Sequence, residues 1–303
     1  MMTVRGFDPG DLPALLALQH AEAGTAPRLT LAELRTALQD AARGHGAQVR
    51  VAHVGGLVAG AAGWVVGPGA MFATPFMTGA GPHARAAAER LLAELRAVQA
   101  AAGAPWIRTS TGDPSSARAA ALAAAGFTPQ FEFLDLVRAT TPAPAPTAPP
   151  PDLHLVAAGG LDRERLRALE NETFADVPNA LPMSAAQIDE ALDEPGAFSA
   201  GTGALVDERG EYVAFLRAQR QADADGVEHA VVDAVGVAAA ARGRGLGRVL
   251  VERMLAAAAA AGIPRAGAII ASTNPASLAL HQALGFTVRH RRQVWQGGDH
   301  PAR

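Results

Sequence analysis

The stretch "ARGRGLGRVLVERML" occupies residues 241–255 and follows the apolar run "HAVVDAVGV" at 229–237. Three glycines alternate in it with arginines, at Arg242, Gly243, Arg244, Gly245, Gly247 and Arg248. Leu, Val and Ala at helical spacing come directly afterwards, so the segment predicts a strand, a tight turn and a helix. Glycines before a helix let backbone N–H groups converge on one point, where the helix dipole adds partial positive charge. The stretch therefore indicates either an anion-binding loop or a plain tight turn.

The spacing of the glycines excludes two common phosphate motifs. The dinucleotide fingerprint G-x-G-x-x-G needs a third glycine at position 248, where this sequence has Arg248, and there is no G-K-[ST] of a P-loop. The arginines would add full charges around the start of the helix. A pyrophosphate is the anion that such a loop fits best.

Composition narrows the class of protein. The chain has 303 residues with 49% hydrophobic content, enough for two ordinary domains. It has no cysteine, which excludes disulfides, a thiolate metal site and a cysteine nucleophile. The formal charge of −3 argues against nucleic acid or an anionic membrane as a partner, and Arg289, Arg291 and Arg292 form only a small local cluster. The N-terminus lacks the apolar core of a signal peptide, so we expect a soluble, cytoplasmic protein.

One segment divides the chain. Residues 139–151, "ATTPAPAPTAPPP", alternate proline with alanine and threonine and contain no core-forming residue. Such a composition predicts an extended connector. We therefore expect a first domain over 1–138 and a second over 152–303, the alternative being a long surface loop within one domain.

The two flanking segments resemble each other. Gly126-Phe127 and Gly285-Phe286 both end helix-like runs and lie 159 positions apart. The same offset carries Arg242 onto His83, where a turn again opens an amphipathic helix. One offset that serves two separated motifs indicates a duplicated unit.

Each half predicts the same succession of elements. Strands are expected at 3–7, 48–54, 57–66, 71–77, 106–110, 131–139, 153–158, 203–208, 211–219, 228–237, 265–272 and 288–296. Helices are expected within 9–23 and at 30–44, 84–101, 115–125, 162–174, 184–193, 244–261 and 275–284. Strands mixed with helices in this way predict two α/β or α+β domains, each with a mixed, mostly antiparallel sheet flanked by helices.

A second motif connects the fold with a known family. The segment "NPASLALHQALGF" at 274–286 follows a predicted strand. Together with the glycine loop it resembles the GNAT superfamily of acyl-CoA-dependent N-acyltransferases, here of a tandem two-domain type similar in layout to mycothiol-synthase-like proteins. Their phosphate loop, [RQ]-x-x-G-x-[GA], is matched by Arg242, Gly245 and Gly247. Their next motif, N-x-x-[AS]-x-x-L-Y-x-x-x-G-F, is matched by Asn274, Ser277, Leu280, Gly285 and Phe286.

The resemblance implies an acetyltransferase that moves an acetyl group from acetyl-CoA to an amine of a small molecule or peptide, without a metal. The implied acetyl-CoA-binding residues are Val235, Gly236, Val237, Arg242, Gly243, Arg244, Gly245, Leu246, Gly247, Arg248, Asn274 and Ser277. The alternative function is a non-catalytic acyl-CoA sensor or interaction module. The acceptor and the oligomeric state stay open, and the mycothiol-type acceptor is not carried over, because the Glu expected there corresponds to Val231.

The family resemblance indicates the residues that would transfer protons less directly than those that would bind acetyl-CoA. His281 stands where the family usually has the Tyr that protonates the leaving thiolate, so it is either that acid or a packed histidine. Strand alternation puts His229, Val231, Asp233 and Val235 on one face, with Glu228 pointing the other way. Asp233 and His229 are therefore the candidates for the base that takes the amine proton, and each is otherwise a capping or solvated side chain.

The first half of the chain has the same predicted elements as the second but lacks the glycines of the loop. At the same offset, Gly245 and Gly247 become Ala86 and Ala88, and His281 becomes Leu122. Each added Cβ crowds the approach of phosphate oxygens to the backbone. We therefore expect a degenerate first domain and an acetyl-CoA site in the second.

Overall fold

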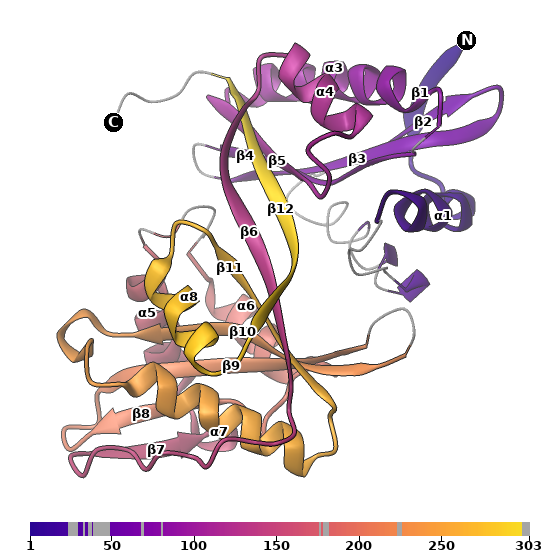
Figure 1. Cartoon of the computed structure of the whole chain (residues 1–303). Helices are drawn as coiled ribbons and strands as arrows, with labels where there is room; N and C mark the ends of the chain where they lie inside the picture. The colour runs from indigo at the N-terminus through magenta and orange to yellow at the C-terminus, as the bar shows by residue number, and fades with distance from the viewer. Residues whose placement is uncertain are drawn as a thin grey trace. The chain divides into compact units, whose positions relative to one another are not determined.

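The computed structural model describes residues 1–23, 30–32, 34–35, 38, 49–67, 70–79, 81–175, 177, 182–222 and 226–298. Its strands are β1 (Met2–Gly6), β2 (Arg50–Val54), β3 (Leu57–Gly67), β4 (Ala70–Thr78), β5 (Trp106–Thr111), β6 (Thr128–Ala139), β7 (Leu153–Ala157), β8 (Gly203–Asp207), β9 (Tyr212–Ala222), β10 (Glu228–Val237), β11 (Arg265–Ala271) and β12 (Thr287–Gly298). Its α-helices are α1 (Leu12–Ala23), α3 (Ala84–Ala102), α4 (Ala117–Ala124), α5 (Arg163–Phe174), α6 (Ala185–Asp193), α7 (Leu246–Ala260) and α8 (Pro275–Ala283). Figure 1 shows them along the chain. The helix predicted at 30–44 falls mostly outside the described residues.

The strands are hydrogen-bonded in the order β1-β2-β3-β4-β5-β12-β6-β11-β10-β9-β8-β7. The pairs β4–β5 and β10–β11 are parallel, whereas β1–β2, β2–β3, β3–β4, β5–β12, β7–β8, β8–β9 and β9–β10 are antiparallel. The prediction of a mixed, mostly antiparallel sheet flanked by helices is confirmed.

The chain forms two compact units. Unit 1 is Met1–Phe133 with His290–Arg303, and unit 2 is Leu134–Arg289. These units differ from the predicted segments 1–138 and 152–303, because β6 and β12 each begin in one unit and end in the other. The physical reason is edge pairing: the end of β12 covers the edge of β5, with Gln293 opposite Thr111 and Gly298 opposite Trp106.

The segment predicted as a connector, 139–151, lies within unit 2 and is hydrogen-bonded to the rest of that unit. Thr140 donates from its backbone N–H to the Pro264 carbonyl (3.1 Å) and from its hydroxyl to the Ile263 carbonyl (2.5 Å). The Thr147 N–H donates to the carboxylate of Glu252 in α7 (3.1 Å). A proline-rich segment has few N–H groups of its own to satisfy, so these few bonds are enough to hold it along the helix.

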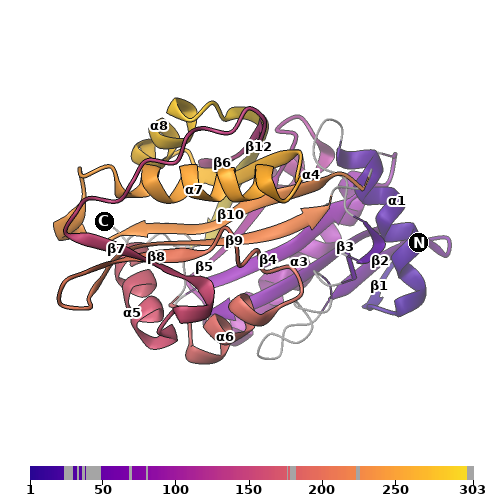
Figure 2. The same ribbon diagram turned by 90° about the horizontal axis from the view of Figure 1, so that it is seen from below.

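Unit 2 is built from helices on both faces of its strands. α7 packs on one face through a core that includes Leu250, Met254 and Leu255, while α5 and α6 cover the other through Leu166, Leu169 and Ile188. Figure 2 shows α7 and α5 on opposite sides of β9 and β10. Two buried faces explain why the strands read as nearly continuous apolar runs.

Unit 1 has the same arrangement. Leu91 and Leu95 of α3 and Leu122 of α4 belong to one core cluster, and Leu12 and Leu15 at the other face belong to a second. Within the described residues of both units, none of the helices combines the length and the apolar character needed to cross a membrane.

The units repeat in detail at the offset of 159 positions. β4 then corresponds to β10, and α4 ends at Ala124 where α8 ends at Ala283. One boundary differs: α7 begins at Leu246, which corresponds to Ala87, yet α3 already begins at Ala84. Unit 1 thus has a helical turn where unit 2 has its glycine loop, because alanine favours a helix and glycine with positive φ interrupts one.

Candidate functional site

The glycine loop sits at the start of α7. Gly243 and Gly245 have φ angles of 79° and 76°, a left-handed conformation that other residues rarely adopt. Gly245 is the N-cap of α7, and no side chain caps the helix there. The first N–H groups of a helix have no partner within it. This end of α7 therefore presents unsatisfied N–H donors and the positive end of a helix dipole to the outside.

Gly247 has a different reason to be glycine. A Cβ built on it would lie 3.3 Å from Cδ2 of Leu280, in α8. Gly243 and Gly245 meet no such neighbour, since nothing lies within 4 Å of a Cβ on either. Small size at 247 keeps α7 close to α8, whereas backbone conformation demands glycine at 243 and 245.

The three arginines of the loop have partners of their own. Arg244 pairs with Asp152 (2.7 Å), and Arg248 pairs with Glu252 one helical turn on (2.7 Å). Arg242 donates from Nε to the carbonyl of Val237 (3.3 Å). Carboxylates therefore offset two of the three arginine charges that the sequence analysis placed around the start of the helix.

β10 separates from its parallel neighbour β11 before the chain reaches this loop. Its pairing with β11 covers His229–Val232 and stops there, although β10 continues to Val237 and β11 to Ala271. The β11-facing edge of β10 is thus free of ladder bonds to β11 beyond Val232, and can bind an extended ligand as a strand would.

A β-bulge marks the point where the two strands part. The pairing of β10 with β9 shifts register between Val232 and Ala234, which leaves Asp233 as the extra residue. Ala230, Val232 and Val235 pack in or against the core under α7, while Ala234 belongs to the core under α5. The prediction that Val235 shares a face with Asp233 is therefore wrong, because the bulge reverses the alternation.

The closing motif is organised by a helix cap. The side chain of Asn274 accepts a hydrogen bond from the Ser277 N–H (3.1 Å) and so caps α8. Asn274 and Ser277 thus lie in the first turn of α8, shortly after the end of β11 at Ala271. The roles of Asn274 and Ser277 in binding acetyl-CoA stay a prediction.

His281 is buried on the inner side of α8, with 1% of its surface exposed. Its Nδ1 lies 2.8 Å from the Ser277 carbonyl, which can only accept, so Nδ1 carries the proton. Nε2 is buried without a partner among the described residues, and the ring meets Phe286 edge-on at 5.0 Å. Burial lowers the pKa of His281, against the opposing effect of the Ser277 carbonyl. A neutral ring with its only proton on Nδ1 has none on Nε2 to give to a thiolate.

This environment predicts a pH-dependent stability that His281→Leu removes. The unfolded chain binds a proton at the ordinary His pKa of 6.5, and the folded chain only at lower pH. The free energy of unfolding from this group is therefore complete above that value and falls as the pH drops toward the folded pKa. Leu122 fills the corresponding place in α4 and is fully buried, so leucine should fit. Urea unfolding at about pH 8 and about pH 5 measures the difference.

The exposed His154→Leu in β7 is the matched control, and it should leave the pH dependence in place. In the same His281→Leu protein we expect kcat for acetyl transfer to stay within about threefold of wild type, well below the effect of losing a general acid. A folded His281→Leu protein with a large loss of kcat, restored in His281→Tyr, would return the proton-donor role to this position.

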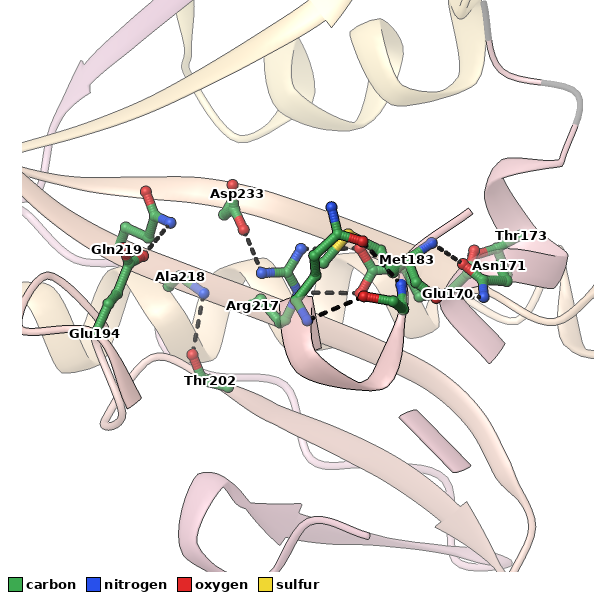
Figure 3. A network of polar contacts seen from close by, with 12 residues as sticks. Glu170, Asn171, Thr173, Met183, Glu194, Thr202, Arg217, Ala218, Gln219 and Asp233 are labelled. Atoms are coloured by element: carbon green, nitrogen blue, oxygen red, sulfur yellow. Dashed lines mark hydrogen bonds and ion pairs between the residues drawn. The ribbon is translucent and has the colours of Figure 1, made fainter. Parts of the chain in front are cut away.

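A buried ion-pair network lies on the α5 side of the bulge, and the sequence analysis did not identify it. Arg217 of β9 contacts Glu170 of α5 through Nε (3.0 Å) and Nη2 (2.8 Å), and Asp233 through Nη1 (2.5 Å). In Figure 3 the guanidinium of Arg217 lies between the two carboxylates. A signal was present: Arg217 is two residues from the core residue Phe215, so strand alternation points a charge into the interior.

The two candidate bases are not equally placed. Asp233 belongs to this network and 30% of its side chain is exposed. His229 lies four residues earlier, about 13 Å along the strand, in the part of β10 that is paired with β11. The structure therefore joins Asp233, and not His229, to the bulge where the strands separate. Among the residues placed by the structure, no group of three or more His, Cys, Asp or Glu side chains is arranged to hold a metal ion.

Comparison with known proteins addresses the family. Residues 163–286 match the model of the acetyltransferase (GNAT) family. A mycothiol acetyltransferase from Thermobispora bispora is 32% identical over 150 residues, covering 49% of this chain and 50% of that protein. One from Salinispora tropica is 31% identical over 194 residues, covering 63% and 62%. The chain thus spans about half to three-fifths of the length of these relatives.

Solved structures address the fold of the whole chain. A GCN5-related N-acetyltransferase from Sphaerobacter thermophilus superposes with a TM-score of 0.78 at 16% identity, covering 100% of this chain and 97% of the other. A tandem GNAT protein from the clavulanic acid biosynthesis pathway gives a TM-score of 0.74 at 18% identity, with 100% of both chains covered. At these identities the likeness concerns the fold. Residues 163–286 thus match the model of the acetyltransferase (GNAT) family, and the chain as a whole has the fold of a tandem GNAT protein.

Proposed function

We propose that unit 2 binds acetyl-CoA and transfers its acetyl group to a primary amine. The observation that carries this proposal is the juxtaposition at the end of β10: a free strand edge, a bulge with a carboxylate, and an uncapped helix start with two left-handed glycines. The family match and the relatives' names support acetyl transfer as the reaction.

The residues present fit acetyl-CoA. The N–H groups of 243–248 would hold the pyrophosphate, because a Cβ-free backbone admits phosphate oxygens closely. The free edge of Val235, Gly236 and Val237 would pair with the amides of the pantetheine arm. An arm that starts at the loop and follows β10 backwards brings the thioester toward the bulge at Asp233.

The chemistry needs positioning and two proton transfers. An acceptor R–NH3⁺ gives one proton to a base, for which Asp233 is placed, and its nitrogen then attacks the thioester carbon. A C–N bond forms, the C–S bond breaks, and the sulfur leaves as a thiolate. The second nitrogen proton is lost as the amide forms, so the products are the N-acetyl amide, CoA thiol and one proton released to solvent. Because His281 has no proton on Nε2, the thiolate takes its proton from water.

The acceptor is an amine of a small molecule or peptide. The relatives are named for mycothiol acetylation, so an acceptor of that kind belongs in the test. The test is release of free CoA thiol by the whole chain with glucosamine, L-lysine, spermidine, an alanine-initiated peptide and the amine precursor of mycothiol, with the product checked by the mass gain of one acetyl group. Saturable acetyl-CoA binding with no thiol release from any amine would favour the non-catalytic sensor.

We predict that each chain binds one acetyl-CoA. In unit 1 the turn before the helix is closed: α3 begins at Ala84, whose N–H donates to the Gly81 carbonyl (3.0 Å), and His83 is the N-cap with a φ of −96°. Thr74 stands where unit 2 has Asp233. Calorimetric titration of the whole chain should give a stoichiometry near one. Two equivalent sites per chain would contradict the degenerate role of unit 1.

A further inference from the structure

The side-chain network of Figure 3 contains charges that acetyl-CoA binding does not require. We infer that Arg217, held by Glu170, is a positioning residue that aims the carboxylate of Asp233 at the acceptor amine. This inference rests on the proposed function of the same site, and it concerns the acceptor alone.

The guanidinium of Arg217 contacts two carboxylates through different nitrogens. Nε and Nη2 form a two-point contact with both carboxylate oxygens of Glu170, and Nη1 is left for Oδ2 of Asp233. A planar guanidinium fork held at two points has no freedom to turn. The direction of Nη1, and with it the position of Oδ2, is therefore set by Glu170 on α5.

The side chains of the network become more exposed from Glu170 and Arg217 toward Asp233. The side chains of Arg217 and Glu170 are each 7% exposed, whereas that of Asp233 is 30% exposed. Burial by itself lowers the pKa of Arg217, but the hydrogen bonds of Glu170 and the charges of Asp233, Glu170 and Glu194 outweigh it and raise the pKa. Arg217 is thus charged at neutral pH, and Asp233 has this cation beside it.

Stability alone does not explain this arrangement. A buried ion pair contributes little net stability compared with apolar residues of the same size, because the desolvation of two charges offsets their attraction. The Glu170–Arg217 pair is neutral as a unit, so the third member, Asp233, supplies the net negative charge. Its other oxygen, Oδ1, accepts no protein hydrogen bond within the described parts of the chain. This oxygen is the one available to an ammonium group.

The site lies where an acceptor has to arrive. Asp233 is the bulged residue at which β10 separates from β11, so its neighbours on the β11 side are the free strand edge assigned to the pantetheine arm. α5 closes over the same strand, since a Cβ on Gly236 would lie 2.5 Å from Oγ1 of Thr173. The network therefore reaches from the helix α5 to the acyl end of the proposed cofactor path, where the carboxylate of Asp233 can meet an ammonium group.

The test compares Arg217→Lys, Asp233→Asn and their combination in the whole chain. Lysine keeps the buried charge beside Glu170 but has one nitrogen, which cannot hold both carboxylates in fixed directions. With the amine of the panel that wild type acetylates fastest, Arg217→Lys should lower kcat/KM for the amine about 10- to 100-fold, as expected for a misplaced reacting group. The Kd for acetyl-CoA should stay within about twofold of wild type, because the loop and the strand edge are untouched.

The double variant separates a positioning role from a structural one. If Arg217 acts through Asp233, then Arg217→Lys has no further effect on kcat/KM once Asp233 is Asn. Equal losses in both backgrounds would overturn the inference. Arg163→Lys is the matched control on the same helix: Arg163 pairs with Asp189 and Asp193 at the surface, and this variant should keep wild-type kinetics.

A second variant covers a failure of Arg217→Lys to fold. Arg217→Met combined with Glu170→Met removes both buried charges, so that only the partly exposed Asp233 loses its ion-pair partner. We expect it to fold, to bind acetyl-CoA and to show the same loss toward the amine. Wild-type kinetics in either folded variant would overturn the inference and leave the proposed function intact. Absence of amine-dependent CoA release in wild type would overturn both.

Discussion

The variant Gly245→Glu is expected to weaken acetyl-CoA binding at least about 100-fold, which corresponds to ~2.7 kcal/mol. Gly245 caps α7 with a φ of 76° and is exposed, so a glutamate there stands at the uncapped start of the helix, where the pyrophosphate is proposed to bind. Its carboxylate takes the place of the pyrophosphate and repels it. The same charge favours the folded apoprotein, because a carboxylate at a helix N-terminus is stabilising. Isothermal calorimetry with acetyl-CoA measures the change.

Gly262→Glu is the control for backbone strain. Gly262 follows the other end of α7, has a φ of 71° and likewise has nothing within 4 Å of a built Cβ. Both variants therefore force a glutamate into the left-handed region at a cost of ~1–2 kcal/mol. Only the variant at Gly245 should lose acetyl-CoA. Equal affinities in the two folded variants would show that the pyrophosphate site lies elsewhere.

The variant Asp233→Asn is expected to lower kcat for amine acetylation by about 10²- to 10⁴-fold, the range for removal of a general base. Asparagine keeps the size of the side chain and an oxygen for Nη1 of Arg217, but it cannot take a proton at neutral pH. Acetyl-CoA affinity should not change, because the proposed cofactor path uses the backbone of β10 rather than this side chain. Steady-state kinetics with saturating acetyl-CoA and calorimetry on the same protein separate the two effects.

Glu228→Gln is the matched change at the other end of β10. Glu228 is an exposed carboxylate before the bulge, opposite Ala222 of β9. We expect kcat within about twofold of wild type, as for a surface substitution away from the site. If Asp233→Asn is as active as Glu228→Gln, then the base is another group and the assignment of Asp233 fails.

The elements of this fold could be read from the sequence because their causes are local. Alternation and helical periodicity located nearly every described strand and helix, and Gly243 and Gly245 adopt the left-handed conformation that a glycine-rich turn before a helix predicts. The Gly-Phe pairs at one offset predicted the duplication, because a repeated frame keeps its spacing even where its residues diverge. The loop, the helix that follows it and the mixed sheet thus depend on residues that are neighbours in the chain.

Contacts between elements were decided only by the tertiary structure. The bulge at Asp233 depends on how β10 pairs with β9, and a single extra residue reverses every face that strict alternation assigned after it. The proton of His281 is set by the carbonyl of Ser277 and by burial, neither of which a motif records. Arg217 and Glu170 are 47 positions apart and meet because α5 covers β9. By itself the sequence determined the local frame and the glycine loop. Which charges meet across that frame was decided by long-range packing, because burial and pairing depend on residues distant in the chain.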